Sequence, residues 1–116
     1  MTHDELVEKY PKILGVQGYP AVGKGWLPLI DVLCGWLQFN TDKNSHIEHY
    51  AHQVKAVQIK EKFGTLRFYV DDASDVQYAA ISFAEAMSGH ICEECGAPGK
   101  IRNNGWIRTL CEEHNK

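Results

Sequence analysis

The chain has 116 residues, of which 44% are hydrophobic, and it contains three Trp, five Tyr and four Phe. This length indicates a single domain, and this composition excludes a chain that is largely disordered. The formal net charge of −3 is unlike that of a typical nucleic-acid-binding protein, in which a basic balance is expected.

The first twelve residues, MTHDELVEKYPK, are charged and contain no apolar segment of the kind found in a secretory signal. No stretch approaches the roughly 18 apolar residues of a membrane-spanning helix. We therefore expect a cytoplasmic protein. Thiols in that compartment are usually reduced, so clustered cysteines are interpreted as metal ligands before disulfides.

The first half of the chain predicts one core helix. Residues 4–10 allow one or two helical turns, and residues 11–25 contain two Pro and four Gly, which indicates an irregular loop. A helix is predicted over 26–39, where apolar residues recur at helical spacing and Pro28 falls in the first turn. The apolar residues are Trp26, Leu29, Ile30, Leu33, Cys34 and Leu37.

A β-hairpin and a second helix follow a polar segment at 41–52. Hydrophobic residues alternate with polar ones on both sides of a turn near Glu61–Gly64. They are Val57, Ile59, Leu66, Phe68 and Val70.

The second helix is predicted from Ser74 to a stop at Gly89, with Gln77 completing a capping box. Its alanines predict close packing of one face against the sheet. We assign to that face Val76, Ala80, Phe83, Ala84 and Met87.

The last residues predict a metal site. Cys92 and Cys95 are separated by two residues, and so are Cys111 and His114. This spacing is typical of structural zinc. A short hairpin with a turn at RNNG and a returning strand over 106–109 fits between the two pairs. The tail thus resembles a zinc ribbon or a truncated treble clef.

Four protein ligands predict one structural zinc, because a catalytic zinc usually keeps a position open for water. A disulfide with leftover thiols and an iron–sulfur cluster are the weaker alternatives. The predicted fold class is therefore α+β. A helix–hairpin–helix body at 1–90 carries a zinc-binding tail at 91–116, which packs on it within one compact domain.

Two further groups were considered as sites. His46, His49 and His52 have a spacing that allows neighbouring pairs to chelate a metal on a helix, but a solvated segment is the better interpretation. Cys34 lies on the apolar face of the first predicted helix and is interpreted as a buried, inert thiol.

The outer face of the hairpin is the main candidate for binding a partner. If Leu66 and Phe68 face the core, then Arg67 and Tyr69 face outward. Cations beside an aromatic ring suit phosphates, bases or an acidic protein surface, whereas a solvated sheet face is at least as good an interpretation. The candidate binding residues of hairpin and tail are Lys60, Lys62, Arg67, Tyr69, Arg102, Trp106 and Arg108.

The segments KEKFGTLRFYV and ICEECGAPGKIRNNGWIRTLCEEH, with GWLPLIDVLC upstream, resemble a family of small proteins encoded by tailed phages and prophages. The similarity covers about residues 25–114. The resemblance implies an accessory phage protein in the bacterial cytoplasm, of a kind that often binds host factors, including components of antiphage defence. It transfers no catalytic activity.

The leading hypothesis is a non-enzymatic, zinc-containing protein that binds a host or phage macromolecule, with a protein as the preferred class of partner. A second hypothesis is sequestration of a phosphorylated nucleotide signal, and a third is nucleic-acid binding through the tail and hairpin. A zinc-dependent hydrolase ranks last. A protein binder is expected to expose an apolar or aromatic patch, whereas a sequestering protein is expected to have a pocket lined with Arg and Lys.

Overall fold

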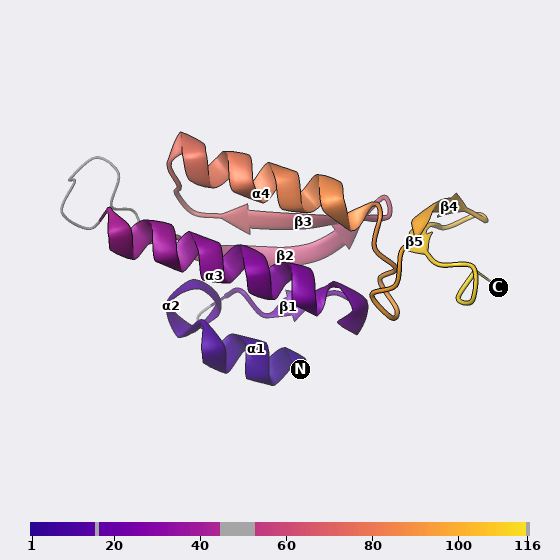
Figure 1. Cartoon of the computed structure of the whole chain (residues 1–116), viewed down its shortest axis with the longest axis horizontal. Helices are drawn as coiled ribbons and strands as arrows, with labels where there is room; N and C mark the ends of the chain where they lie inside the picture. The colour runs from indigo at the N-terminus through magenta and orange to yellow at the C-terminus, as the bar shows by residue number, and fades with distance from the viewer. Residues whose placement is uncertain (16, 45–52, 116) are drawn as a thin grey trace.

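Within the described residues, three strands form the central sheet, and three helices longer than one turn accompany them (Figure 1). The computed structural model describes residues 1–15, 17–44 and 53–115. In chain order the elements are α1 (His3–Lys9), α2 (Pro11–Leu14), β1 (Pro20–Ala21), the 3-10 turn η1 (Lys24–Trp26), α3 (Leu27–Lys43), β2 (Ala56–Lys62), β3 (Thr65–Val70), α4 (Asp75–Ser88), β4 (Lys100–Asn103) and β5 (Ile107–Leu110).

The sheet has the order β1-β2-β3, with β1 parallel and β3 antiparallel to β2. Helices α3 and α4 contact each other, and α4 packs along β3. A second sheet, β4-β5, lies at one end of the elongated molecule, whose extents are 50 × 26 × 20 Å (Figure 1). The mixed α+β class expected from the sequence is thus confirmed. No helix in the described ranges is both long and apolar enough to cross a membrane.

The main core lies between the helices and one face of the sheet. The predicted apolar face of α3 is confirmed, since Ile30, Cys34 and Leu37 are completely buried there. They pack with Ile59 and Phe68 of the sheet. Helix α3 runs to Lys43, past the predicted end at residue 39. His46, His49 and His52 lie outside the described residues.

The predicted core face of α4 is wrong for three of its five residues, since Ala84 is buried and Ala80 packs against the core. Val76, Phe83 and Met87 are exposed. The buried residues of this helix are Gln77, Ile81, Ala84 and Ser88. Hydrophobic periodicity did not identify this buried face because two of its four residues are polar.

Both buried polar residues have hydrogen-bonding partners. The Gln77 amide donates to Asn40 Oδ1 and Thr41 Oγ1 at 3.2 Å each, and Ser88 Oγ accepts from the Leu66 N–H at 2.8 Å. Satisfied polar groups of this kind are tolerated in a core. Gln77 and Ser88 thus occupy buried positions, where hydrophobic periodicity predicts apolar side chains.

The hairpin departs from simple alternation at one position. The register between β2 and β3 shifts between Ala56 and Gln58, and such a bulge moves a side chain to the other face. Val57, expected to face inward with Ile59, is therefore 39% exposed. The hairpin turns at Phe63 and Gly64, which have φ of 53° and 87°. This matches the left-handed requirement of a two-residue hairpin turn.

Candidate metal centre and neighbouring surfaces

The four predicted ligands lie together at the junction of the tail's loops. One donor atom from each of Cys92, Cys95, Cys111 and His114 lies within 4.8 Å of all the others. The Cys95 and Cys111 sulfurs are 3.8 Å apart, and His114 Nδ1 lies 3.2 Å from Cys111 Sγ. Sulfur ligands at the vertices of a tetrahedral metal site are about 3.8 Å apart when each metal–sulfur bond is about 2.3 Å. The cluster therefore fits a tetrahedral metal ion.

Backbone hydrogen bonds shape the first pair of ligands into a tight loop. The Gly96 N–H donates to the Cys92 carbonyl at 2.8 Å, and the Cys92 N–H donates to the Ala97 carbonyl at 2.8 Å. Gly96 has a φ of 83°, which an L side chain adopts only with strain. The second pair follows directly after β5. These turns therefore direct the side chains of both ligand pairs toward one point.

The hydrogen bond with His114 favours the thiolate form of Cys111. This bond is the largest cause that lowers the pKa of the Cys111 thiol to about 6, against the opposing effect of desolvation. The thiolate is the form that binds a metal ion. The electrostatic environment of Cys111 therefore favours binding of a divalent cation.

Hydrogen bonds attach the loop over residues 92–96, here called the metal loop, to the body. The Gly25 N–H donates to the Glu93 carbonyl at 2.8 Å, and the Gly23 N–H donates to Glu93 Oε2 at 2.9 Å. The indole of Trp26 donates to the Ile91 carbonyl at 2.8 Å. These contacts fix the tail against η1.

A second attachment joins β5 to the hairpin tip, where Thr109 Oγ1 donates to the Gly64 carbonyl at 2.7 Å. Sequence analysis missed Glu93 and Thr109 as docking residues. A carboxylate between two cysteine ligands ordinarily indicates an exposed loop position. The burial of Glu93 results from contacts with residues 23 and 25, far away in sequence, and with Arg108 and Thr109 of β5.

Carboxylates of the tail neutralise its two arginines. Arg102 pairs with Glu112 at 3.1 Å, and Arg108 pairs with Glu94 at 2.7 Å and Glu93 at 3.7 Å. The hydrogen bond from Arg108 is the main cause that lowers the pKa of Glu94. Both cations are therefore already engaged. Trp106 stands in the turn between β4 and β5 and is 73% exposed.

The candidate binding residues of the hairpin lie together on its outer face. Lys60 is directly opposite Arg67 in the β2–β3 register, and Gln58 is opposite Tyr69. Lys62 is opposite Thr65 near the tip. Within residues 1–15, 17–44 and 53–115, no carboxylate forms an ion pair with Lys60 or Arg67. This face thus carries two adjacent cations without counterions.

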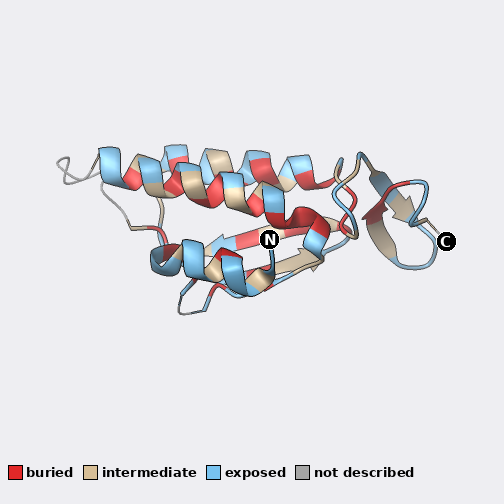
Figure 2. Cartoon of the chain, turned by 60° about the horizontal axis from the view of Figure 1, so that its bottom comes forward, coloured by how far each residue is buried: buried red, intermediate tan, exposed pale blue. Residues whose placement is uncertain are grey.

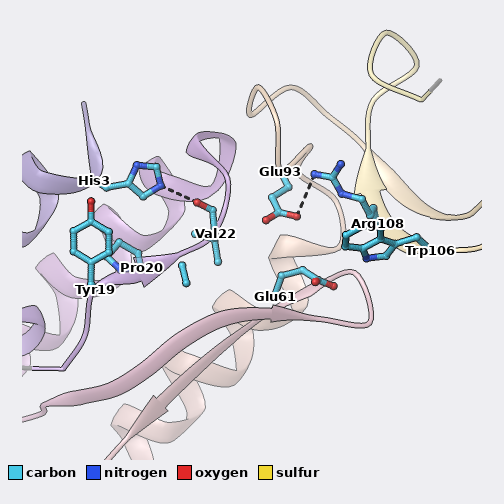
Figure 3. A pocket seen from close by; sticks show the side chains of 9 residues that line it. His3, Tyr19, Pro20, Val22, Glu61, Glu93, Trp106 and Arg108 are labelled. Carbon is cyan, nitrogen blue, oxygen red and sulfur yellow. Dashed lines mark hydrogen bonds and ion pairs between the residues drawn. The ribbon is translucent and has the colours of Figure 1, made fainter.

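A hollow of about 600 Å³ lies between β1 and the tail (Figure 3). Tyr19, His3 and Trp106 contribute rings to its walls, and Glu61, Glu93 and Arg108 contribute charges. Figure 3 shows Arg108 turned toward Glu93. With two carboxylates and one guanidinium that is already paired, this hollow is poorly suited to a phosphate group.

Cys34 is the one cysteine of the chain outside the cluster, and it is fully buried among core residues. Desolvation raises the pKa of its thiol well above the ordinary range. Since the thiolate is the reactive form, we expect iodoacetamide at neutral pH to modify Cys34 at least about a hundredfold more slowly in the folded protein than in the unfolded chain. Peptide mapping by mass spectrometry measures this rate separately from the cluster thiols. Rapid modification of folded protein would contradict an inert, buried thiol.

The chain matches no family model, and it has no significant similarity to any curated protein or to any solved structure.

Proposed function

We propose that this chain is a non-enzymatic, zinc-containing binding protein that docks on an acidic surface of a partner protein through the outer face of its β2–β3 hairpin. The observation that carries the proposal is the cross-strand pair of Lys60 and Arg67, neither of which pairs with a carboxylate of the described residues.

Like charges directly opposite each other on neighbouring strands destabilise a sheet. An isolated chain therefore bears an electrostatic cost at Lys60 and Arg67 that a carboxylate-bearing partner relieves. Tyr69 is 40% exposed next to Arg67 and supplies an aromatic surface that can be desolvated on binding. The combination of aromatic side chain and unpaired cations suits recognition of an acidic protein surface.

The metal in this proposal is one structural zinc. Three thiolates and one imidazole match the donors that zinc prefers, and they fill its four positions. The tail is then a zinc ribbon, and its ion stabilises β5 against the hairpin tip through the contact between Thr109 and Gly64. A closed site leaves no position for a metal-bound water, which favours a structural role over hydrolysis.

Charge favours a protein partner over the alternatives. The net charge is −3. The acidic residues Asp71 and Asp72 directly follow β3, and Asp75 begins α4. A nucleic-acid backbone that extends along the hairpin in that direction meets like charge. The hollow beside Trp106 presents carboxylates rather than free cations, which disfavours sequestration of a phosphorylated ligand. The resemblance to phage proteins makes a host protein, such as an antiphage defence component, the natural partner to search for.

Replacing Lys60 or Arg67 by alanine should weaken binding of an acidic partner without destabilising the fold. A charge-assisted hydrogen bond is worth about 1.5–3 kcal/mol, so each variant should bind a labelled polyglutamate peptide about tenfold or more weakly. Lys60→Ala also removes a like-charge contact. Its free energy of unfolding should therefore stay within about 0.5 kcal/mol of the wild type, or rise. Fluorescence anisotropy beside thermal melting measures both quantities.

Lys12→Ala is the matched control, because Lys12 is an exposed cation in α2, away from the hairpin. It should leave peptide binding unchanged. Unchanged affinity in Arg67→Ala with a large fall in Tm would show that Arg67 is structural and would overturn the proposal. Binding of the wild type to inorganic phosphate or to a DNA duplex, but not to the acidic peptide, would replace it with one of the other two hypotheses. Capture from infected cells, with the Lys60→Ala, Arg67→Ala double variant as negative bait, then identifies the partner.

A further inference from the structure

Each of the two long helices carries a second stripe, which is wholly apolar, beside the face that it buries in the core. On α3 this outer stripe follows spacings of three, four and three residues, and its members are Leu29, Val32, Trp36 and Phe39. On α4 it follows spacings of four, three and four, and its members are Val76, Ala80, Phe83 and Met87. None of the eight side chains is ionisable.

Most side chains of the outer stripes are open to solvent, whereas Leu29 and Ala80 are partly buried against the core. Val32 is 72% exposed and Phe83 69% exposed, while Phe39 and Val76 are each more than half exposed. Figure 2 shows exposed residues recurring along both helices beside the buried ones. A surface helix of a monomer normally has one apolar stripe, toward the core, and polar residues elsewhere. The second stripes therefore indicate a further packing partner.

The two stripes border one apolar hollow. It has a volume of about 300 Å³, and the nearly buried side chains of Leu33 and Ala84 form part of it. Val32 and Phe83, which also line this hollow, are its most exposed side chains. The face thus combines projecting side chains with a recess, which is what a self-complementary surface requires.

The spacing of residues in the two outer stripes indicates the shape of the partner. Apolar residues separated alternately by three and four positions form the seam along which helices pack side by side. A partner that presents two helices with matching apolar stripes satisfies both seams at once. A second copy of this chain presents two such helices. In a dimer with two-fold symmetry, each apolar stripe of one copy contacts an apolar stripe of the other.

The area is of the right size for an interface between two copies. A large side chain carries about 150–250 Å² of surface, so the exposed parts of the two stripes amount to about 600 Å² of apolar surface. This is at the upper end of the largest patches that monomers tolerate, about 300–600 Å². A standard interface buries about 800 Å² from each partner, so the apolar face with a polar rim supplies one side of it.

We infer that two copies of this chain pair through the outer stripes of α3 and α4, which form a layer of four helices at the centre of a homodimer. The helices cover the inner face of the sheet, so the outer face of each hairpin, with Lys60 and Arg67, points away from this interface. The inference does not depend on the proposed function, and it makes the dimer bivalent toward any ligand of the hairpin.

Sedimentation velocity and light scattering of the full-length, metal-loaded chain test the inference. The wild type should have twice the chain mass of 13.1 kDa over a wide range of concentrations. Phe83→Asp places a charge at the centre of the interface. Because burying an unpaired charge is very unfavourable, the dissociation constant of the dimer should rise by at least about a hundredfold. The variant should keep the helical circular dichroism of the wild type, since the side chain is exposed within one chain.

Tyr78→Asp is the matched control. Tyr78 is also an exposed aromatic residue of α4, but it does not line the apolar hollow. This variant should remain dimeric. A wild type that is monomeric at every concentration overturns the inference, even if an amphipathic helical peptide binds the face. A Phe83→Asp variant that stays dimeric also overturns it, because the copies then meet elsewhere. If Phe83→Asp does not fold, Val32→Asp gives the same test from α3.

Discussion

Replacing Cys111 by serine should abolish tight metal binding and open the tail, while the helix–hairpin–helix body stays folded. The wild type should contain one zinc per chain, whereas the variant should contain far less. Structural zinc contributes about 10–16 kcal/mol of apparent binding free energy in small zinc-binding peptides. The tail has little to replace it, because its own core comprises only Cys92, Leu110 and Cys111, with Ala97 packed against them.

The body has a separate and larger core, built from α1, α2, α3, α4 and the three-stranded sheet. We therefore expect amide hydrogen exchange to accelerate over residues 92–115 and to change little in β2, β3 and α4. The backbone amide of Gly25 in η1 should become less protected, because it loses the Glu93 carbonyl as a hydrogen-bond acceptor. Elemental analysis and exchange mass spectrometry on the same samples measure both effects, and chelation of the wild type should reproduce them.

Cys34→Ala is the control for this experiment, because it removes a cysteine that lies outside the cluster. It should retain one metal ion per chain. A Cys111→Ser variant with a full metal complement and a protected tail would contradict the assignment of the ligands. Loss of protection throughout α3 would show instead that body and tail fold as a single unit.

The grouping of four Cys and His side chains that could hold a metal ion is the part of the structure best predicted from the sequence. Its ligands come in pairs two residues apart, so a local turn determines their geometry. The long helices and the hairpin were also predictable, because each produces its own periodicity over a few turns or residues. The observed bounds differ mainly at the end of α3, which continues to Lys43.

The face of α4 that packs on the sheet was not predictable from periodicity. Two stripes lie side by side on this helix, one wholly apolar and one that contains Gln77 and Ser88, and hydrophobic periodicity favours the apolar one. The structure buries the stripe with Gln77 and Ser88, because partners in α3 and β3 satisfy their hydrogen bonds. Those partners are far away in sequence, so no local pattern reports them.

The docking of the tail was hidden for the same reason. Glu93 is 6% exposed because it contacts Gly23 and Gly25, about seventy residues earlier in the chain. In the sequence, residues 11–25 show only the Gly and Pro content of a loop. The requirement for glycine at position 25 becomes apparent only in the structure, where the metal loop lies against it.

Replacing Gly25 by alanine should be among the most destabilising single changes in this protein. An added Cβ would lie 2.1 Å from the Cys92 carbonyl oxygen, 2.6 Å from the Glu93 carbonyl oxygen and 2.6 Å from the Gly96 nitrogen. All three are backbone atoms of the metal loop, so no side-chain rotation relieves the clash. The loop must move away from η1 and give up the hydrogen bond between Gly25 and Glu93.

We expect Gly25→Ala to lower the free energy of unfolding by about 3 kcal/mol, which corresponds to a Tm about 10–15 °C lower. Gly35→Ala is the matched control, because the nearest atom to its added Cβ is the hydroxyl oxygen of Tyr10 at 3.1 Å, at the end of a side chain that can shift. In the middle of α3 alanine is favoured over glycine by about 0.5–1 kcal/mol, so this control should melt near the wild type or above it. Thermal melting with zinc titration compares the two variants. If Gly25→Ala melts with the wild type and binds zinc equally well, the metal loop is not seated against η1. If it instead loses stability and zinc affinity together, the body positions the cysteines as much as the metal does.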